Sequence, residues 1–196
     1  MEKFIVRSAG ATDLRFVERI VEEIKKASQV KGAGIAIRTN EYISSKILEG
    51  KAVIALTDSG RWAGFCYIES WGHNKFVANS GLIVSDEFRG NGLAKAIKEK
   101  AMHISFQLFP GAKLFGLTTN LAVMKINSNL GYKPVTFSEL TTDDQFWKGC
   151  ESCSYYDILV RTKRTHCLCT GMIKEPEKPL NGEKKVKTGE EKIIIE

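Results

Sequence analysis

The stretch LIVSDEFRGNGLAK, Leu82–Lys95, decides the fold: an aliphatic run passes through a glycine-containing turn into a helical pattern. Backbone N–H groups at a helix start lack intrahelical partners, and the helix dipole adds partial positive charge there. Gly90 and Gly92 carry no side chain, so an anion can approach the main chain closely. Arg89 and Lys95 add formal charge. The stretch therefore predicts a cradle for a diphosphate group.

Strand and helix patterns alternate on both sides of this cradle. The order of elements predicts an α/β layout with an antiparallel half and one β-α-β crossover. Alternating or buried apolar runs predict strands at Lys3–Ala9, Ala52–Thr57, Trp62–Ser70, Phe76–Val84, Leu114–Thr119, Tyr132–Phe137 and Tyr155–Thr162. Apolar residues at three- and four-residue spacing predict helices at Leu14–Ile24, Asn40–Leu48, Leu93–Leu108 and Val123–Leu130.

The chain is long enough for one self-sufficient domain, predicted over residues 1–172. It has 196 residues, of which 43% are hydrophobic, and no apolar run approaches the ~20 residues that a membrane-spanning helix needs. Residues 173–196 are predicted to form a disordered charged tail, because they are rich in Lys and Glu and bury little apolar surface. An added strand at Ile193–Ile195 is the alternative for the end of that tail.

The charge balance favours anionic ligands. Lys and Arg number 29 and Asp and Glu 23, and the tail is neutral, so the folded body carries the excess of +6. No Lys/Arg run is dense enough to argue for nucleic acid. The N-terminal residues enter a strand pattern without the apolar segment of a signal peptide, which predicts a cytoplasmic protein with reduced thiols. We expect neither a nucleic-acid nor a membrane partner.

The hexapeptide RGNGLA, Arg89–Ala94, matches neither the Rossmann nor the P-loop pattern. It resembles the Arg/Gln-x-x-Gly-x-Gly/Ala signature of the GNAT superfamily of acyl-CoA-dependent N-acyltransferases. The resemblance extends in order over about Phe4–Thr162, and Gly131-Tyr132 fits the Gly-Phe/Tyr pair after the family's fourth helix. It implies a mixed, largely antiparallel central sheet with a β-α-β acyl-CoA-binding core and flanking helices, and acetyl-CoA or another acyl-CoA as co-substrate.

The resemblance also implies where the cofactor binds. The family's fourth and fifth strands splay apart and admit the pantetheine arm, which pairs here with Leu82, Ile83 and Val84. A backbone N–H near Ile83 is then expected to stabilise the oxyanion. Asn120 fits a frequent pantetheine contact, with an ordinary helix N-cap as the alternative. The pyrophosphate is expected on the main chain of Arg89, Gly90, Asn91, Gly92, Leu93, Ala94 and Lys95.

Acyl transfer to an amine calls for a base, since the amine must first lose a proton. Glu69, at the end of a strand, and His73, in the bend after it, are the candidates; a solvated carboxylate and a polar loop residue are the alternatives. The family often places an acidic Tyr four residues before the Gly of its Gly-Phe/Tyr pair, and here that position is Asn127. An amide is no acid, but a thiol of pKa near ~8.5 can leave as thiolate, so Asn127 is expected to hydrogen-bond pantetheine or sulfur.

Four further segments give a narrower resemblance. They are similar to the small GNAT proteins of Bacteroidetes-type bacteria assigned to the first step of arginine biosynthesis, the acylation of the α-amine of glutamate. The segments are GFCYIE (Gly64–Glu69), FVANSGLIV (Phe76–Val84), AVMKIN (Ala122–Asn127) and FWKGC (Phe146–Cys150).

A dicarboxylate acceptor such as glutamate requires cationic side chains, ideally an Arg fork. Arg38, Lys75 and Lys125 are the candidates, each with a solvated surface charge as the alternative. Other readings of the chain remain open at this point. They are a GNAT enzyme for another amine (a peptide N-terminus, a lysine or a polyamine), a non-catalytic acyl-CoA-binding protein, and a zinc-containing nucleic-acid binder. The acyl group and the oligomeric state stay open, a homodimer among the alternatives.

Two cysteine pairs carry a second motif. Cys150 and Cys153 precede the expected strand at Tyr155–Thr162, and Cys167 and Cys169 follow it. If a hairpin brings the two pairs together, they complete a tetrahedral Cys₄ zinc site. Reduced thiols without a metal and a redox disulfide are the alternatives.

Overall fold

The computed structural model describes residues 2–30, 35–176 and 192–195. Its strands are β1 (Phe4–Ser8), β2 (Ala52–Thr57), β3 (Trp62–Trp71), β4 (Phe76–Val84), β5 (Lys113–Thr118), β6 (Lys133–Val135), β7 (Thr170–Lys174) and β8 (Ile193–Ile195). Its α-helices are α1 (Val17–Ser28), α2 (Asn40–Leu48), α3 (Leu93–Leu108), α4 (Leu121–Asn129), α5 (Asp144–Lys148) and α6 (Tyr156–Arg161). Short 3₁₀ turns are η1 (Ala11–Phe16), η2 (Asp86–Phe88) and η3 (Phe137–Glu139).

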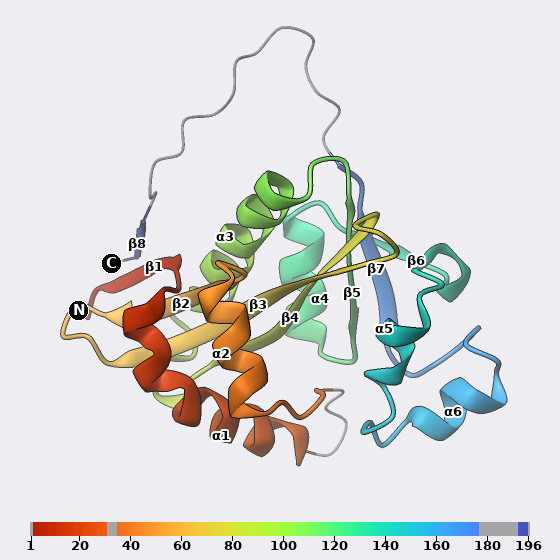
Figure 1. The fold of residues 1–196 in the computed structure, drawn as a ribbon, viewed down its shortest axis with the longest axis horizontal. Coiled ribbons are helices and arrows are strands. Elements are labelled where there is room, and N and C mark those ends of the chain that lie inside the picture. Colours follow the sequence, from red (N-terminus) through yellow and green to blue (C-terminus); the bar gives the residue numbers. More distant parts are fainter. Residues whose placement is uncertain (1, 31–34, 177–191, 196) are drawn as a thin grey trace, which may run out of the picture.

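All the strands join one sheet in the order β6-β7-β5-β4-β3-β2-β1-β8 (Figure 1). Every neighbouring pair is antiparallel except β4 and β5, which are parallel. The link between these two strands is α3, as a crossover between parallel strands requires. The predicted α/β class, with a largely antiparallel sheet and one β-α-β unit, is confirmed.

Helices cover both faces of the sheet, and each face has its own core. On one face α3 packs on the sheet through residues such as Ile97 and Ala101, and Met124 and Ile126 of α4 pack against the same cluster. On the other face Ile20 of α1 and Ile43 of α2 cover β2 and β3. A third cluster, around Phe115, Trp147 and Ile173, packs α5 and the segment before α6 onto β4, β5 and β7. The two helix layers lie on opposite sides of the sheet (Figure 1).

The sheet opens between β4 and β5. The two strands pair only from Phe76 opposite Lys113 to Ala78 opposite Phe115, and beyond these residues they diverge (Figure 1). On the other side of β4, the register with β3 shifts between Phe65 and Tyr67, at a bulge that contains Gly81. Gly81 has φ +62°, and a side chain there would collide with the Tyr67 ring, so glycine is required. The predicted splay of the fourth and fifth strands is confirmed.

One strand prediction near the C-terminus is wrong. The expected strand Tyr155–Thr162 instead contains helix α6, Tyr156–Arg161, with an Asp157–Arg161 ion pair at i,i+4 spacing, because a short contiguous apolar run fits a helix as well as a strand. The last large strand is β7, Thr170–Lys174, which pairs with both β5 and β6. The expected domain boundary at Met172 therefore falls inside a strand.

The expected tail is only partly described. Ile193–Ile195 forms β8, the alternative that the sequence left open, and pairs with Val6, Ile5 and Phe4 of β1. Residues 177–191, where disorder was expected, lie outside the described residues. The two ends of the chain thus meet at one edge of the sheet (Figure 1).

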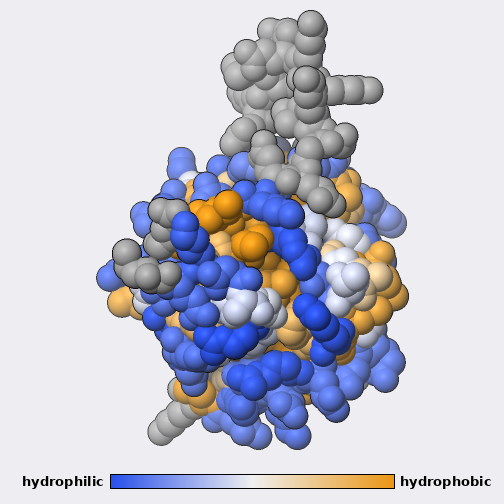
Figure 2. Space-filling view, turned by 90° about the vertical axis from the view of Figure 1, so that its left-hand side faces the viewer, coloured by the Kyte–Doolittle hydropathy of each residue, from blue (hydrophilic) through white to orange (hydrophobic). Residues whose placement is uncertain are grey.

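The surface on the β1 side mixes charged residues with small hydrophobic areas (Figure 2). Ile194 of the edge strand β8 is 64% exposed, which is ordinary for a single apolar side chain on a surface. Within the described ranges, no helix combines the length and apolar character that crossing a membrane requires.

Candidate active site

The predicted cradle forms at the start of α3. Gly92 is the N-cap of this helix with φ +75°, and Gly90 has φ +88°, so both adopt a conformation that side chains rarely allow. A Cβ atom placed on either glycine would have no atom within 4 Å, so the space beside the main chain is open. The first N–H groups of a 16-residue helix point into this space. The geometry is that of an anion-binding helix start.

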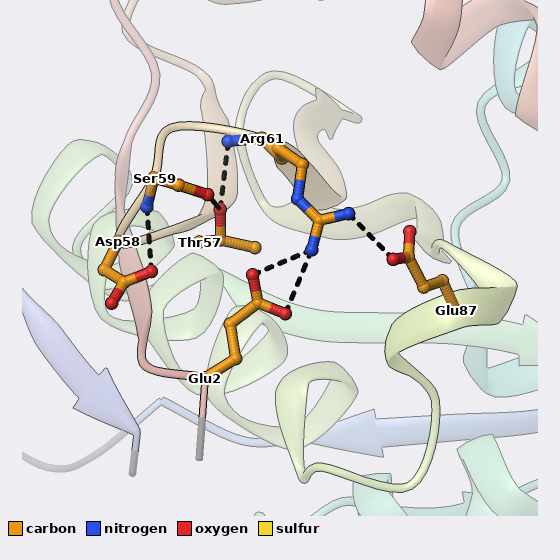
Figure 3. A network of polar contacts seen from close by, with 6 residues as sticks. All are labelled: Glu2, Thr57, Asp58, Ser59, Arg61 and Glu87. Carbon is orange, nitrogen blue, oxygen red and sulfur yellow. Dashed lines mark hydrogen bonds and ion pairs between the residues drawn. The ribbon is translucent and has the colours of Figure 1, made fainter.

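Polar contacts of Arg61 hold η2, the turn that leads into the cradle (Figure 3). Arg61, in the β2–β3 turn, donates to Glu87 of η2 at 2.7 Å and to Glu2 at 2.8 Å. Its guanidinium also lies 5.0 Å from the ring centre of Phe88, which is buried against Phe4. These contacts fix the turn that leads from β4 into α3. Arg89, the motif arginine, is exposed and pairs with Asp86 at 2.6 Å.

The open edge of β4 faces the gap with its main chain. Ser85 donates its N–H to Ala63 across the β3 side, and the Ile83 carbonyl oxygen lies 2.9 Å from the Cβ position of Gly64 in β3. Because successive residues of a strand direct their polar groups to opposite edges, the N–H groups of Leu82 and Val84 face away from β3. Val84, next to Ile83, thus presents its main-chain N–H to the gap.

A cluster of polar side chains around Glu69 lies beside the residues at which β4 and β5 cease to pair. Glu69 of β3 is opposite Ala78, the last β4 residue that pairs with β5, and is 8% exposed. It accepts a hydrogen bond from the Tyr42 hydroxyl of α2, and Lys46 of α2 lies 3.4 Å from the same oxygen. A buried carboxylate is thereby kept beside one donor and one cation.

Arg38 extends this cluster. Its Nε donates to the Tyr67 hydroxyl at 2.9 Å, Nη1 donates to the Ile37 carbonyl, and the guanidinium lies 5.0 Å from the Tyr42 ring centre. Burial, opposed by the Arg38 charge, raises the pKa of Tyr67 to about 12. Burial, with Tyr67 and Glu69 nearby, also raises the pKa of Tyr42. Both hydroxyls therefore stay protonated at neutral pH, where that of Tyr42 donates to Glu69 and that of Tyr67 accepts from Arg38.

The sequence missed Tyr42, Lys46 and Tyr67 as site residues. The signal for them was spacing: Tyr42 and Lys46 are one helical turn apart, and Tyr67 and Glu69 are two apart on one strand. Each pair shares a face, and folding brings the two faces together.

Other predicted residues lie elsewhere. His73 is exposed in the β3–β4 turn. Hydrogen bonds from the Gly72 and Gln145 main chain, with a smaller contribution from the charge of His73, lower the pKa of Asp143 at the start of α5. His73 thus faces α5, and the fold does not bring it to the Glu69 cluster. Lys75 is exposed in the same turn. Lys125 is exposed on α4, which covers the opposite face of the sheet from α2. Of the three cations expected at the acceptor, only Arg38 joins the cluster.

The two predicted asparagines differ in their surroundings. Asn120 is the N-cap of α4, where its side-chain oxygen accepts from Ala122 and Val123. Asn127 is 2% exposed, and its Nδ2 lies 3.7 Å from the Met172 sulfur. Its Oδ1 is buried and has no hydrogen-bond partner among the described residues. Such an unpaired buried acceptor costs about 1–3 kcal/mol and calls for a donor.

The four paired cysteines converge although the segment between them is a helix. Cys150, Cys153, Cys167 and Cys169 line one small cavity. Burial, with the neighbouring Cys167, Cys153 and Cys150 thiols, raises the pKa of Cys169 to about 12. Over the described residues, no three His, Cys, Asp or Glu side chains stand in the arrangement of a metal-ligand set. Cys66, by contrast, is a buried core residue of β3, as predicted.

A comparison with family models decides the family. The model of the acetyltransferase (GNAT) family matches residues 24–132, more than half of the chain. The chain belongs to the GNAT acetyltransferase family. This match includes the cradle, the opening between β4 and β5 and the Glu69 cluster, so the resemblance of the RGNGLA motif is confirmed. No curated protein matches the chain.

Solved structures show the same GNAT fold at low sequence identity. N-acetylglutamate synthase from Neisseria gonorrhoeae, complexed with coenzyme A and N-acetyl-glutamate, is 15% identical with a TM-score of 0.61 over 89% of this chain. The chain spans only 35% of that protein's length. Rv2747 from Mycobacterium tuberculosis, in complex with CoA and NLQ, is 14% identical with a TM-score of 0.63, over 87% of this chain and 98% of its own.

A further solved structure has a different acceptor in its name. The phosphinothricin acetyltransferase from Sinorhizobium meliloti, in complex with AcCoA, is 18% identical with a TM-score of 0.60, over 90% of this chain and 93% of its own. Identities this low show a shared fold for all these proteins.

Proposed function

We propose that this GNAT protein transfers an acetyl group from acetyl-CoA to the α-amine of L-glutamate. The observation that carries the proposal is the opening of the sheet beyond Ala78 and Phe115. The Glu69 cluster lies where this opening begins, because Glu69 is opposite Ala78, and the cradle follows the other end of β4. A cofactor arm that enters this opening has its phosphates at the start of α3. Its thioester then lies near the side chains that suit an amine.

Cofactor binding is assigned mainly to the main chain. The pyrophosphate binds the N–H groups from Gly90 to Ala94, where both glycines leave the approach open, and Lys95, whose own N–H donates to the Gly92 carbonyl, adds its charge. The pantetheine arm takes the place of the missing β5 pairing along Leu82–Val84. The buried Oδ1 of Asn127, on the helix that follows β5, accepts a hydrogen bond from the arm or from the thiol. Asn120 retains its amide nitrogen for a further contact, because only its oxygen is used in the cap.

Glu69 is assigned as the base. It takes a proton from the acceptor ammonium, directly or through one water, and the free amine then attacks the thioester carbonyl. The Val84 N–H stabilises the oxyanion that forms. When the tetrahedral species collapses, the C–S bond breaks, coenzyme A leaves as thiolate and the nitrogen of the new amide loses its extra proton to solvent, so no covalent enzyme intermediate is needed. Tyr42 and Tyr67 remain protonated and position Glu69 and Arg38.

Arg38 is assigned to the acceptor carboxylate. Its Nη2 group forms no hydrogen bond with any residue in the described ranges, and it lies 4.0 Å from the Cβ position of Gly149. Gly149 thus places no side chain against this group. An Arg fork suits a carboxylate, and the solved synthase with bound N-acetyl-glutamate supports an acceptor of this class.

A thiol-release assay tests the proposal. Acetyl-CoA is offered with glutamate, glutamine, aspartate, a lysine-containing peptide and a polyamine, and free coenzyme A is measured. We expect the highest kcat/KM with glutamate. Activity confined to another amine would refute the acceptor assignment, and binding of acetyl-CoA without turnover on any amine would refute the catalytic assignment.

The acyl group is tested separately. With glutamate held constant, acetyl-CoA is compared with propionyl- and succinyl-CoA. A preference for a longer acyl group would replace the acetyl assignment and leave the acceptor assignment intact.

A further inference from the structure

Two cysteine pairs from either side of helix α6 line one cavity outside the Glu69 cluster. Cys150 and Cys153 lie between α5 and α6, and Cys167 and Cys169 lie between α6 and β7. All four are partly buried and line a cavity of about 60 Å³, together with Ala36 and Leu117. Small-molecule pockets are several times larger, about 300–1,000 Å³, so this cavity suits an ion and not a substrate.

The main chain around these thiols is arranged in tight turns. The N–H of Cys153 donates to the Cys150 carbonyl at 2.9 Å, and Tyr156 donates in turn to Cys153. After helix α6, the Thr162 hydroxyl donates to the His166 carbonyl at 2.7 Å. The sequence thus provides one Cys-x-x-Cys turn and one Cys-x-Cys pair, joined by a short helix, which is the donor set of a Cys₄ zinc site.

We propose that Cys150, Cys153, Cys167 and Cys169 bind one zinc ion with a structural role. Four S–Zn bonds form and four thiol protons pass to solvent, which leaves the site with a net charge of −2. Within the described residues the side chains do not yet form a closed ligand set. Zinc binding therefore requires the four side chains to rotate about their Cα–Cβ bonds and bring the sulfur atoms to a common centre.

Nearby cations favour a negatively charged centre. The Nη2 atom of Arg38 lies 4.0 Å from the Cβ position of Gly149, the residue before Cys150. Arg164 is itself fixed by an ion pair with Asp144 at 2.6 Å and lies 6.0 Å from the Trp147 ring centre. Four thiolates around Zn²⁺ carry two excess negative charges, which such guanidinium groups offset.

The site would also stiffen the wall formed by Gly149 and Ala36 beside Arg38, the residue assigned to the acceptor carboxylate. Gly149, next to Cys150, faces the Nη2 group of Arg38, and Ala36 lines the cysteine cavity two residues before Arg38. A metal that ties the segment after α5 to the segment before β7 therefore limits how far this wall can move. The zinc assignment stands without the glutamate assignment, because it depends only on the four cysteines.

Metal analysis of the full-length protein tests the proposal. The protein is purified under reducing conditions without chelator, and its zinc content is measured by mass spectrometry of the elements. We expect one zinc per chain, and loss of most of it in Cys153→Ser and Cys169→Ser. The matched control is Cys66→Ala, which removes a thiol outside the cluster and keeps the zinc.

Cobalt substitution provides a readout that does not depend on variant folding. Wild-type protein loaded with Co²⁺ should show the intense visible bands and thiolate charge-transfer absorption of a tetrahedral sulfur site. Either of two results overturns the proposal: wild-type protein that binds neither Zn²⁺ nor Co²⁺ while all four thiols react with a thiol reagent, or an intact mass that shows a disulfide in place of metal. Turnover with acetyl-CoA is scored separately, so failure of the metal site and failure of the proposed function are distinguishable.

Discussion

The cradle at the start of α3 and the cluster around Glu69 are built in opposite ways. The cradle presents main-chain N–H groups beside two glycines, with open space around them. The Glu69 cluster consists of side chains from α2, β3 and the segment before α2, and its central carboxylate is buried. One site binds by backbone geometry, and the other binds by side chains that only the folded sheet brings together.

This difference explains what each site can recognise. A backbone cradle suits a phosphate group of any nucleotide cofactor, so it needs little beyond glycine and a helix start. A side-chain cluster sets which amine is accepted, because each donor and charge is placed individually. Substitutions in the two regions should therefore change different kinetic constants.

Glu69→Gln is expected to have the largest effect. Glutamine keeps the size of the side chain and can still accept from Tyr42, but it cannot take a proton. We expect kcat to fall by about 10²–10³-fold, within the usual range for a general base, while the Kd of acetyl-CoA stays unchanged. Steady-state thiol release and calorimetric titration measure the two quantities.

Glu22→Gln is the matched control for this variant. Glu22 is an exposed carboxylate of α1 on the same face of the sheet, and its loss should leave kcat unaltered. If Glu69→Gln retains wild-type kcat, the base is another group.

Gly92→Ala tests the cradle. A methyl group there occupies the open space in which the pyrophosphate is expected, and we predict a Kd for acetyl-CoA raised by about 10- to 100-fold, or ~1.4–2.7 kcal/mol. Gly111→Ala is the control, since Gly111 also has positive φ (+83°) and open space but lies outside the cradle. Both variants carry a backbone cost of roughly 1–2 kcal/mol in stability. Equal loss of CoA affinity in the two would contradict a specific role for Gly92.

The same contrast separates what the sequence could predict from what it could not. The cradle was predictable because glycines, a strand and a helix start are consecutive in Leu82–Lys95, so local rules suffice. The strands Ala52–Thr57 and Phe76–Val84 and the helix Leu93–Leu108 were predicted with their observed bounds for the same reason. Ala52–Thr57 is an almost continuous apolar run between polar turns, and Leu93–Leu108 keeps three- and four-residue spacing over 16 residues.

The acceptor side depends on contacts between distant residues. Arg38 and Tyr67 are 29 positions apart, and no local pattern states that they meet. The α6 region was predicted as a strand because six contiguous residues gave too short a pattern to separate the two periods, and β7 then fell partly outside the expected domain. His73, Lys75 and Lys125 were plausible by chemistry alone, and the fold places them elsewhere.

Arg38→Lys should change recognition of the acceptor more than chemistry. Lysine keeps the charge but loses the planar fork, so we expect the KM for glutamate to rise about 10-fold with kcat nearly unchanged. Lys75→Ala and Lys125→Ala are controls that remove cations outside the cluster and should leave this KM unaltered. An unchanged KM in Arg38→Lys would show that the acceptor carboxylate binds another residue.

Asn127→Leu is expected to have the smallest effect, in opposite directions for stability and activity. Leucine is close in size to asparagine and removes the Oδ1 atom that has no partner in the described structure, so the free energy of unfolding should rise by about 1 kcal/mol. If that oxygen accepts a hydrogen bond from bound pantetheine or its thiol, kcat/KM for acetyl-CoA should fall several-fold in the same variant. Denaturant unfolding and thiol release measure the two changes.

Two other outcomes would contradict this prediction. A variant that is more stable and fully active would mean that Asn127 has no part in cofactor binding. A variant that is less stable would mean that the contact of Asn127 with Met172 outweighs the unpaired oxygen. Only the combination of gained stability and lost activity identifies Asn127 as a buried polar group retained for the cofactor.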